Sequence, residues 1–549
     1  MKRILSILMA VLLIASLAAA CATNRDDPAT TEETDAPAQN VAIHTPAGVE
    51  GDDPADDNDG EGPRRGGTLV FSPTSEGSGP VGLPWAIGWG DVAVPGPFNQ
   101  ALIAEWMDGT INHVLAISHE VDVENRHITF QLRPNVIFHD HSPFNAEVVV
   151  WNFGRIAEHS AWPTGLLDVV ALDDMTVRFY WETIENSTLG RHSQSFTSMV
   201  AYETYGIDWL RDNPIGTGPF TMVSYVRGAY AFYERWEHYW DEGRPYLDAV
   251  HMIFLSDPLV QSLGLQQSAD GEGRIDVVAT HTQEITIQFF QMGYNIMIVA
   301  NQCIALWLPI DDPANPLYNP LVRQAISMAV DRELIAETLG AGVKIPSLQF
   351  VPPGFRGRVD DPTFGAPAYN PERARELMAE AGFPDGFSTN LYPQPGRVSD
   401  AATVAIHSML SEIGIDAEIV IMDMAGHTQM RREIGWSGIV IDMYGAWIHV
   451  EDSLRGSFVF GHDQEGVHPE RLSIPPSPEL RRLVDAAFFF GDNTQQIIDT
   501  AAYILAPENL WMIPMWNQGI MNILHPRVAG MDLPSIGLPF DRMWLREGL

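Results

Sequence analysis

Residues 369–387 read YNPERARELMAEAGFPDGF and contain the clearest helix signal in the chain. Asn370 is a residue type that caps helix N-termini, and Pro371 suits the first helical position. Apolar residues between 374 and 381 then recur at helical spacing, and Gly382 is a typical helix stop. The stretch therefore predicts a capped helix whose role is packing.

Similar signals occur earlier in the chain. Asn319, followed by proline, predicts the start of a second helix, and Asp331 can cap a third. Strand signals precede them, in β-branched, aromatic or alternating stretches at Gly66–Phe71, Ile128–Leu132 and Thr176–Trp181. Strands and helices that alternate in this way predict α/β domains with mixed sheets.

Composition narrows the class of protein. The chain has 549 residues, 71 Asp and Glu against 32 Lys and Arg, two cysteines and 45% hydrophobic residues. This length allows two to four globular domains with sizeable cores. A formal net charge of −39 argues against a nucleic-acid binder and against direct contact with anionic lipid headgroups. Two cysteines exclude a disulfide framework or a Cys-rich metal site.

The N-terminal residues predict export from the cytoplasm. A basic Met1–Arg3, an apolar Ile4–Ala15 and small residues before Cys21 form a signal peptide over residues 1–21. The small residues before Cys21 resemble a bacterial lipobox, so we expect Cys21 to be lipidated. Plain cleavage without lipid attachment is the alternative. Residues 22–65 are acidic and poor in apolar side chains, which predicts a disordered tether.

Motifs for catalysis are weak throughout the chain. Residues 216–219 read GTGP and lack the Lys and Ser/Thr of a P-loop, so we interpret them as a turn that leads into a strand. Residues 139–141 read HDH, which we interpret as a turn rather than a metal site. Cys303 lies in an apolar stretch and predicts a buried thiol. We therefore expect no enzyme activity, no cofactor and no metal, and an exported hydrolase is a distant alternative.

Several stretches, in the same order along the chain, carry a family resemblance. They are residues 130–133, 136–140, 143–144, 216–220, 239–240, 244–248, 273–277, 315–335, 351–354, 369–387 and 511–514. Through them, residues 66–549 resemble the extracellular solute-binding proteins of family 5. These are the receptors of peptide/nickel-type ABC importers.

This resemblance implies a fold and a set of partners. The fold is a two-lobed α/β flytrap of the type II periplasmic-binding-protein class, with an extra domain inserted in the N-terminal lobe. The implied boundaries are 66–95, 215–305 and 515–549 for lobe I, 96–214 for domain II and 306–514 for lobe III. The implied partners are a solute and the permease and ATPase subunits of an importer, and the receptor itself is expected to be a monomer outside the cytoplasm.

Aromatic and polar residues near strand ends are the candidates for ligand contact. Aromatic rings supply contact area at low entropic cost, and amide or imidazole groups orient polar ligand atoms. The candidates are Trp85, Trp89, Tyr444, Trp447, His449, Trp516 and Asn517.

One departure from the family concerns the ligand. Peptide-binding relatives usually place an Asp, which pairs with the ligand amine, shortly after the Trp that matches Trp447. Here residues 448–450 read IHV, so the amine partner is missing unless Glu451 or Asp452 replaces it. Oligopeptide is the leading ligand class, oligosaccharide is the main competitor, and a nickel chelate stays open.

Overall fold

The computed structural model describes most of the chain after the acidic segment. The described residues are 41–42, 62–77, 79–86, 93–159, 165–192, 194–267, 273–280, 283–340, 343–445, 449–460, 471, 473–531 and 538–546. The chain divides into two units, Met1–Asn40 and Val41–Leu549, and all elements named below belong to the second unit. The predicted signal peptide, Cys21, Trp89 and Trp447 lie outside the described residues, as does nearly all of the predicted tether.

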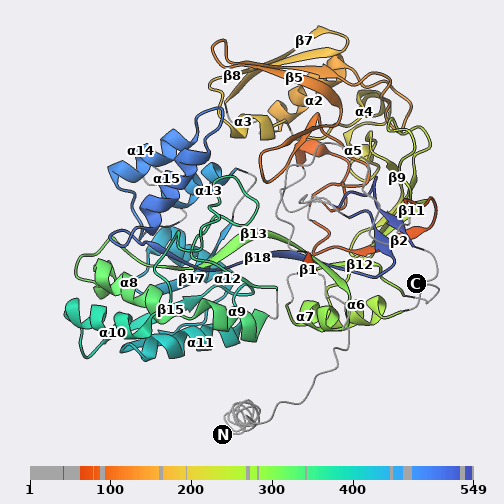
Figure 1. The fold of residues 1–549 in the computed structure, drawn as a ribbon. Coiled ribbons are helices and arrows are strands. Elements are labelled where there is room, and N and C mark those ends of the chain that lie inside the picture. The colour runs from red at the N-terminus through yellow and green to blue at the C-terminus, as the bar shows by residue number, and fades with distance from the viewer. Residues whose placement is uncertain are drawn as a thin grey trace. The chain divides into compact units, whose positions relative to one another are not determined.

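A mixed sheet of 12 strands runs through the second unit (Figure 1). Its main path follows the order β16, β15, β17, β13, β18, β12, β2, β11, β10, β9. In addition, β1 pairs with β13, and β14 pairs with β18. The strands are β16 (Ile415–Ile419), β15 (Phe387–Pro393), β17 (Ile439–Gly445), β13 (Asn295–Trp307), β18 (Met512–Leu524), β12 (Val277–Thr280), β2 (Thr68–Ser72), β11 (Ala249–Ile253), β10 (Tyr230–Arg235), β9 (Phe220–Val226), β1 (Val41–Ala42) and β14 (Ile345–Pro346).

Two long antiparallel strands, β13 and β18, connect the two halves of this sheet. β13 pairs with β17 over Gln302–Trp307, whereas β18 pairs with β12 over Met521–Leu524. Their own pairing shifts register at Val299/Gln302 and at Ile304/Ala305. Such irregularities bend a strand locally and increase its twist, which suits a connection between two bodies.

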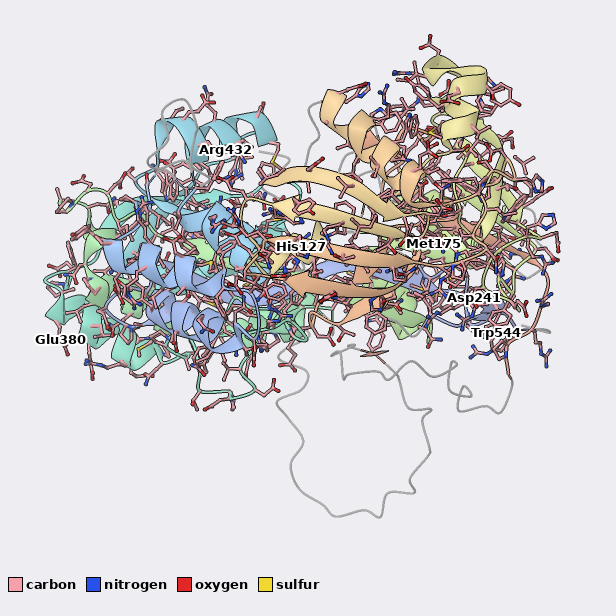
Figure 2. The ribbon with its side chains drawn as sticks, turned by 90° about the horizontal axis from the view of Figure 1, so that it is seen from above. His127, Met175, Asp241, Glu380, Arg432 and Trp544 are labelled. Atoms are coloured by element: carbon pink, nitrogen blue, oxygen red, sulfur yellow. The ribbon has the colours of Figure 1, made fainter. Side chains whose placement is uncertain are left out.

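A second, four-stranded antiparallel sheet has the order β5, β6, β8, β7. Its strands are β5 (Ala116–Asp122), β6 (His127–Leu132), β8 (Thr176–Trp181) and β7 (Leu166–Asp173). In β6 and β8 every second residue is buried, because one face of the sheet packs against helix α2 (Ala146–Glu158). His127 and Met175 mark opposite ends of this sheet in Figure 2. The short strands β3 (Ile103–Glu105) and β4 (Ile111–His113) pair with each other beside it.

Helices cover both parts of the fold. Near the second sheet lie α3 (Ser187–Gly190), α4 (Met199–Tyr205) and α5 (Ile207–Leu210). The others are α6 (Pro258–Leu265), α7 (Gln283–Gln291), α8 (Pro320–Ala329), α9 (Arg332–Gly340), α10 (Pro371–Glu380), α11 (Asp400–Ser411), α12 (Met424–Gln429), α13 (Val450–Phe458), α14 (Pro478–Ala487) and α15 (Thr494–Leu505). In the described part of the chain, no helix combines the length and apolar character needed to cross a membrane.

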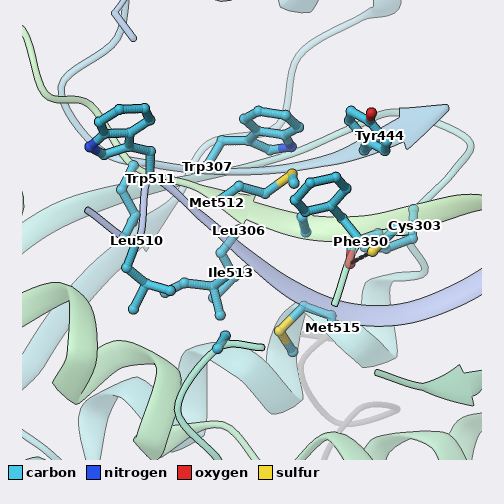
Figure 3. Close-up of a cluster of buried hydrophobic side chains, with 14 of the residues drawn as sticks. Cys303, Leu306, Trp307, Phe350, Tyr444, Leu510, Trp511, Met512, Ile513 and Met515 are labelled. Atoms are coloured by element: carbon cyan, nitrogen blue, oxygen red, sulfur yellow. Dashed lines mark hydrogen bonds between the residues drawn. The ribbon is translucent and has the colours of Figure 1, made fainter. Parts of the chain in front are cut away.

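The largest core lies around the C-terminal ends of β13 and β17 and the start of β18. Trp307, Phe350 and Tyr444 are fully buried there, and the rings of Phe350 and Tyr444 meet edge to face at 5.0 Å (Figure 3). Cys303 belongs to the same cluster, and burial raises the pKa of its thiol to about 12. The predicted buried, unreactive thiol is confirmed.

The predicted helix at 369–387 is confirmed in detail. It is α10, in which Asn370 Oδ1 accepts a hydrogen bond from the backbone N–H of Arg373 and Pro371 is the first residue. Gly382 follows with φ = +92°, a conformation that favours glycine. The caps predicted at Asn319 and Asp331 are also present, on α8 and α9.

The two turn interpretations are confirmed as well. A Cβ atom at Gly216 would lie 2.0 Å from the carbonyl oxygen of Phe98, so this glycine allows a close approach of two backbones before β9. His139 Nε2 lies 3.0 Å from the carbonyl oxygen of Gly218, and His141 adopts φ = +64° in a turn. The glycines and the histidines therefore pack against each other at one junction.

Candidate functional site

Three neighbouring strands bring two of the candidate residues onto one face of the large sheet. Tyr444 on β17 lies opposite Cys303 on β13, which lies opposite Asn517 on β18. Residues directly opposite each other in antiparallel strands share a face. Asn517 is fully buried, and neither its Nδ2 nor its Oδ1 has a hydrogen-bond partner within the described part of the chain.

An unpaired buried amide costs about 1–3 kcal/mol, which a ligand or an ordered water can recover. Gln302 Oε1, one residue along β13 from Cys303, is also buried without a partner in the ranges described. Both groups lie on the strands that connect the two halves of the sheet, but they point to opposite faces of it. On the face of Asn517, a polar ligand would complete the hydrogen bonding of the protein.

Trp516 lies on the opposite face of β18 from Asn517. Its Nε1 donates to Gln518 Oε1 at 2.8 Å, and Lys344 Nζ lies 5.2 Å from the centroid of its ring. Alternate residues of a strand point to opposite faces. A ligand on one face of β18 can therefore contact Asn517 or Trp516, but not both.

A group of arginines surrounds one buried carboxylate at the same end of β17. Asp442 is fully buried, and its Oδ2 lies 3.1 Å from Arg431 Nη1 and 3.0 Å from Arg471 Nη2. Burial raises the pKa of Asp442 to about 6, although Arg431 and Arg397 act in the opposite direction. Arg431 and Arg471 thus contact the carboxylate directly, and Arg397 lies close enough to act on its pKa.

Local backbone geometry explains how these groups come together. β15 and β17 are parallel, so their carboxyl ends lie at the same edge, where open α/β sheets usually bind ligands. Beyond β15, residues 394–397 form a turn in which Gly396 has φ = +70°, and this turn presents Arg397. The side chain of Gln394 ties the turn to β17, because its Oε1 accepts from the N–H of Met443 at 3.3 Å.

Two more polar groups in this region have no partner of their own. Arg397 Nη1 is buried and makes no hydrogen bond to any described residue. His427 lies on α12, about one turn before Arg431 in the sequence, and is fully buried. Both of its ring nitrogens lack partners in the described ranges. Burial, helped by the nearby Arg431, lowers the pKa of His427 to about 4, so the ring is neutral at pH 7. This basic cluster (Arg397, Arg431 and Arg471 around Asp442) has the chemistry of an anion site.

The basic cluster was not predicted from the sequence. Arg397 carries a local signal, since it follows a strand and a Pro-Gly turn, the kind of loop that often carries function. Arg431 and Arg471 carry no such signal, because they come from separate loops and helices that only the fold brings to Asp442.

His449 occupies a different environment from the one predicted. Its Nε2 lies 2.9 Å from Glu105 Oε2, and its Nδ1 lies 3.7 Å from Glu451 Oε1. Burial by itself would lower the pKa of His449, but hydrogen bonds and charge pairing with both carboxylates raise it to about 10. Glu451 also accepts from Asn493 Nδ2 at 3.1 Å. Glu451 therefore already has partners within the protein. Of the two residues that could pair with the amine of a ligand, only Asp452 has no hydrogen bond or ion pair within the described residues.

Trp85 lies in the core beside the four-stranded sheet. Its ring is 6% exposed and contacts the rings of Trp151, His159 and Tyr202 at centroid distances of 6.3, 5.6 and 6.5 Å. Tyr444 belongs to the other large core. The structure thus brings Tyr444 and Asn517 together and separates Trp85 from them by placing it in a different cluster.

Comparison with protein families agrees with this architecture. Residues 110–463, more than half of the chain, match the model of bacterial extracellular solute-binding proteins, family 5 Middle. The chain belongs to the family 5 extracellular solute-binding proteins. The resemblance predicted from the sequence motifs is confirmed, and so is the α/β fold class.

Several known proteins are similar to this family 5 member in sequence or in fold. It is 27% identical over 342 residues to the glutathione-binding protein GsiB of Salmonella typhi. This match covers 60% of this chain and 65% of that protein, which is slightly under two thirds of its length. HbpA2 from Haemophilus parasuis is 21% identical with a TM-score of 0.73, over 87% of this chain and all of its own. DppA from Helicobacter pylori, solved with the peptide STSA, is 21% identical with a TM-score of 0.65, over 88% and 99% of the two chains. At these identities the two structural likenesses show the fold alone.

Proposed function

We propose that this protein is the extracytoplasmic solute receptor of an ABC importer and binds an oligopeptide between two closing lobes. Membership of family 5 and the similarity to a glutathione-binding protein support this function. Lobe I would comprise residues 66–95, 215–305 and 515–549, domain II residues 96–214, and lobe III residues 306–514. β13 and β18 would be the hinge, because they cross between the two halves of the sheet. The receptor would act by binding alone, and hydrolysis of ATP would belong to separate subunits.

The basic cluster is the observation that favours a ligand with an acidic group. A guanidinium pairs with a carboxylate through two parallel hydrogen bonds, and Arg397 Nη1 is buried with no described partner. Arg431 and Arg471 contact Asp442, so the buried Nη1 of Arg397 is the group of the cluster that we assign to a ligand carboxylate. The terminal carboxylate of a peptide fits this requirement better than a neutral sugar does.

The proposed ligand contacts follow from this placement. We assign Asn517 and Arg397 to the ligand, and we retain Trp89 and Trp447 as aromatic contacts. Tyr444 would support the site from beneath, because its ring is buried against Phe350. The remaining candidates, Trp85, Trp516 and His449, would act in packing and in contacts between segments.

Export and membrane attachment are part of the same proposal. We propose that Cys21 is lipidated and that residues 22–65 keep the receptor close to the membrane. The test is metabolic labelling with radioactive palmitate in a bacterial host. Labelling that Cys21→Ala abolishes would support the anchor, and labelling that persists in that variant would contradict it.

A thermal-shift screen of the full chain tests the ligand class. The probes are di- to pentapeptides with free C-termini, the same peptides as C-terminal amides, oligosaccharides and nickel–histidine complexes. We expect the free-acid peptides to raise the melting temperature, since a ligand that binds only the folded state stabilises it. No shift with any class at millimolar concentration would overturn the receptor proposal, and a shift with oligosaccharides alone would replace peptide with sugar.

Arg397→Ala tests the role of this arginine in the same screen. The C-terminal amides should raise the melting temperature less than the free-acid peptides do. The variant should reduce the melting-temperature shift caused by the free-acid peptides and leave the shift caused by the amides unchanged. Arg482→Ala is the matched control, because Arg482 is an exposed arginine paired only with Glu479 on the same helix among the described residues. Equal peptide shifts in both variants would remove Arg397 from the site.

A further inference from the structure

Residues 103–191, called here the insert segment, contact residues 449–493, called here the C-terminal segment. Asn186 Nδ2 donates to the carbonyl oxygen of Gly491 at 2.9 Å, and the N–H of Gly491 donates back to Asn186 Oδ1 at 2.9 Å. Next to this pair, Glu185 forms an antiparallel bridge with Phe489 and lies 3.6 Å from Arg455. These bonds join two segments that are far apart in the sequence, so they would break in any movement that separates the segments.

His449 is the charged centre of this contact. Its ring projects from the N-cap of α13 and lies between Glu105 on β3 of the insert segment and Glu451 on its own segment. All three side chains are nearly inaccessible to solvent, with exposures of 10% for His449, 4% for Glu105 and 2% for Glu451. Two buried carboxylates that flank one imidazole require the ring to carry its proton.

Other charged groups lie around this pair of carboxylates. Asp452 on α13 interacts electrostatically with His449, with Arg455 of the same helix and with Arg191, which follows α3 of the insert segment. Both arginines also pair with Glu185, so the carboxylates Glu105 and Glu451 are the charges that act on the ring and favour a cation there. Asn493, which is neutral, completes the shell by its hydrogen bond to Glu451.

We propose that His449 and Glu105 form a proton-operated latch, so that joining the insert segment to the C-terminal segment takes up one proton. The joined arrangement, called here the closed state, holds the imidazolium between Glu105 and Glu451. In the separated, open state Glu105 is withdrawn and water reaches the ring. The latch rests on the proposed receptor function, because it assigns a role to the closing movement.

The titration of His449 fixes the direction of the effect. The pKa of His449 is raised from 6.5 to about 10 by its two carboxylate partners in the closed state. In the open state Glu451 stays beside the ring but Glu105 does not, so we expect a lower pKa than in the closed state, and between the two values only the closed state holds the proton. The ratio of closed to open molecules should therefore fall by up to about tenfold for each pH unit between the open-state and closed-state values, and should be constant below the open-state value.

Two measurements on the ligand-free full chain test the latch. The first is an NMR titration of the 17 histidines, labelled with ¹³C, in which the His449 signal is assigned by its loss in His449→Gln. The second is small-angle X-ray scattering from pH 6 to pH 10. We expect His449 to titrate above pH 8 and the radius of gyration to rise with pH over the same range. A His449 pKa near 6.5, or a radius of gyration that does not change with pH, would overturn the latch.

Variants separate charge from structure. His449→Gln should stay open at all pH values, whereas His449→Lys, which remains charged, should lose the pH dependence between pH 7 and 9 without opening. If His449→Gln does not fold, Glu105→Gln replaces it in the test. This variant should lower the pKa of His449, because it removes one of the two carboxylates that raise it. His127→Gln is the control, because His127 pairs with Asp122 inside the insert segment and should leave the pH dependence unchanged.

The outcome is independent of the ligand screen. If no solute stabilises the protein but closure depends on pH as described, the receptor proposal fails and the latch stands. If a solute binds but closure does not depend on pH, the receptor proposal stands and the latch fails.

Discussion

Gly190→Ala should open the contact between the insert segment and the C-terminal segment without weakening either one. Gly190 is the last residue of α3, and a Cβ atom there would lie 2.8 Å from His449 Nε2 and 3.2 Å from Glu105 Oε2. Ordinary van der Waals contact begins at 3.4 Å, so the imidazole must move by at least about 0.6 Å. The same Cβ also crowds the carboxylate oxygen with which the ring pairs at 2.9 Å, so the pair cannot keep its present geometry.

The size of the effect follows from the bond that is lost. A hydrogen bond to a charged group contributes about 1.5–3 kcal/mol, which corresponds to a change of about 10- to 150-fold in an equilibrium constant. The ratio of closed to open molecules should fall by this factor. The affinity for any peptide that binds the closed state should fall in proportion, because the competent fraction is reduced.

Two assays measure this effect. Small-angle X-ray scattering at pH 7.5 gives the radius of gyration, and calorimetric titration gives the affinity for the peptide identified by thermal shift. Gly154→Ala is the matched control, since Gly154 is an exposed glycine of α2 with no atom within 4 Å of an added Cβ. Both alanines should gain about 1 kcal/mol of helix propensity, but only Gly190→Ala should open the contact. If the two variants have the same radius of gyration and the same peptide affinity, the interpretation of this interface is wrong.

Three further predictions concern stability and reactivity. Asn370→Ala removes the N-cap of α10 and should cost about 1 kcal/mol in urea unfolding, whereas Asn370→Asp, which keeps an acceptor, should restore most of it. Burial lowers the pKa of His192 to about 3, so only the unfolded chain gains this proton as the pH falls below 6.5. Unfolding free energy should then drop by roughly 1.4 kcal/mol per pH unit, and His192→Phe should flatten this slope; an unchanged slope would contradict the assignment. Cys303 should not react with Ellman's reagent until guanidinium unfolds the chain, and a Cys303→Ala control should show no such additional thiol.

Local structure in this protein follows closely from local sequence. The helix at α10 begins and ends where Asn370 and Gly382 predicted, because a cap and a positive φ depend only on neighbouring residues. The strand predicted at Thr176–Trp181 coincides with β8, whose alternation of buried and half-buried residues follows the period of a strand. Such signals are short in range and survive in any tertiary context that does not oppose them.

The candidate site was only partly predictable. Asn517 and Tyr444 were chosen because aromatic and amide residues at strand ends are typical of binding sites, and the structure places them on one face of the sheet. The buried core around Trp85 was not anticipated, since a tryptophan in a Pro-Gly-rich loop gives no local sign of the helices that cover it. The partners of His449 could not be inferred either, because Glu105 is far from it in the sequence.

The sequence by itself determined the α/β class, several individual helices and strands, the buried thiol and the family. Hydrophobic periodicity, helix caps and linear motifs determine these properties, and all of them are properties of contiguous residues. Only the tertiary structure decided which charges meet: Arg397, Arg431 and Arg471 around Asp442, and Glu105 beside His449. The physical reason is that an ion pair depends on the distance between atoms in space, which chain topology sets and no local pattern encodes.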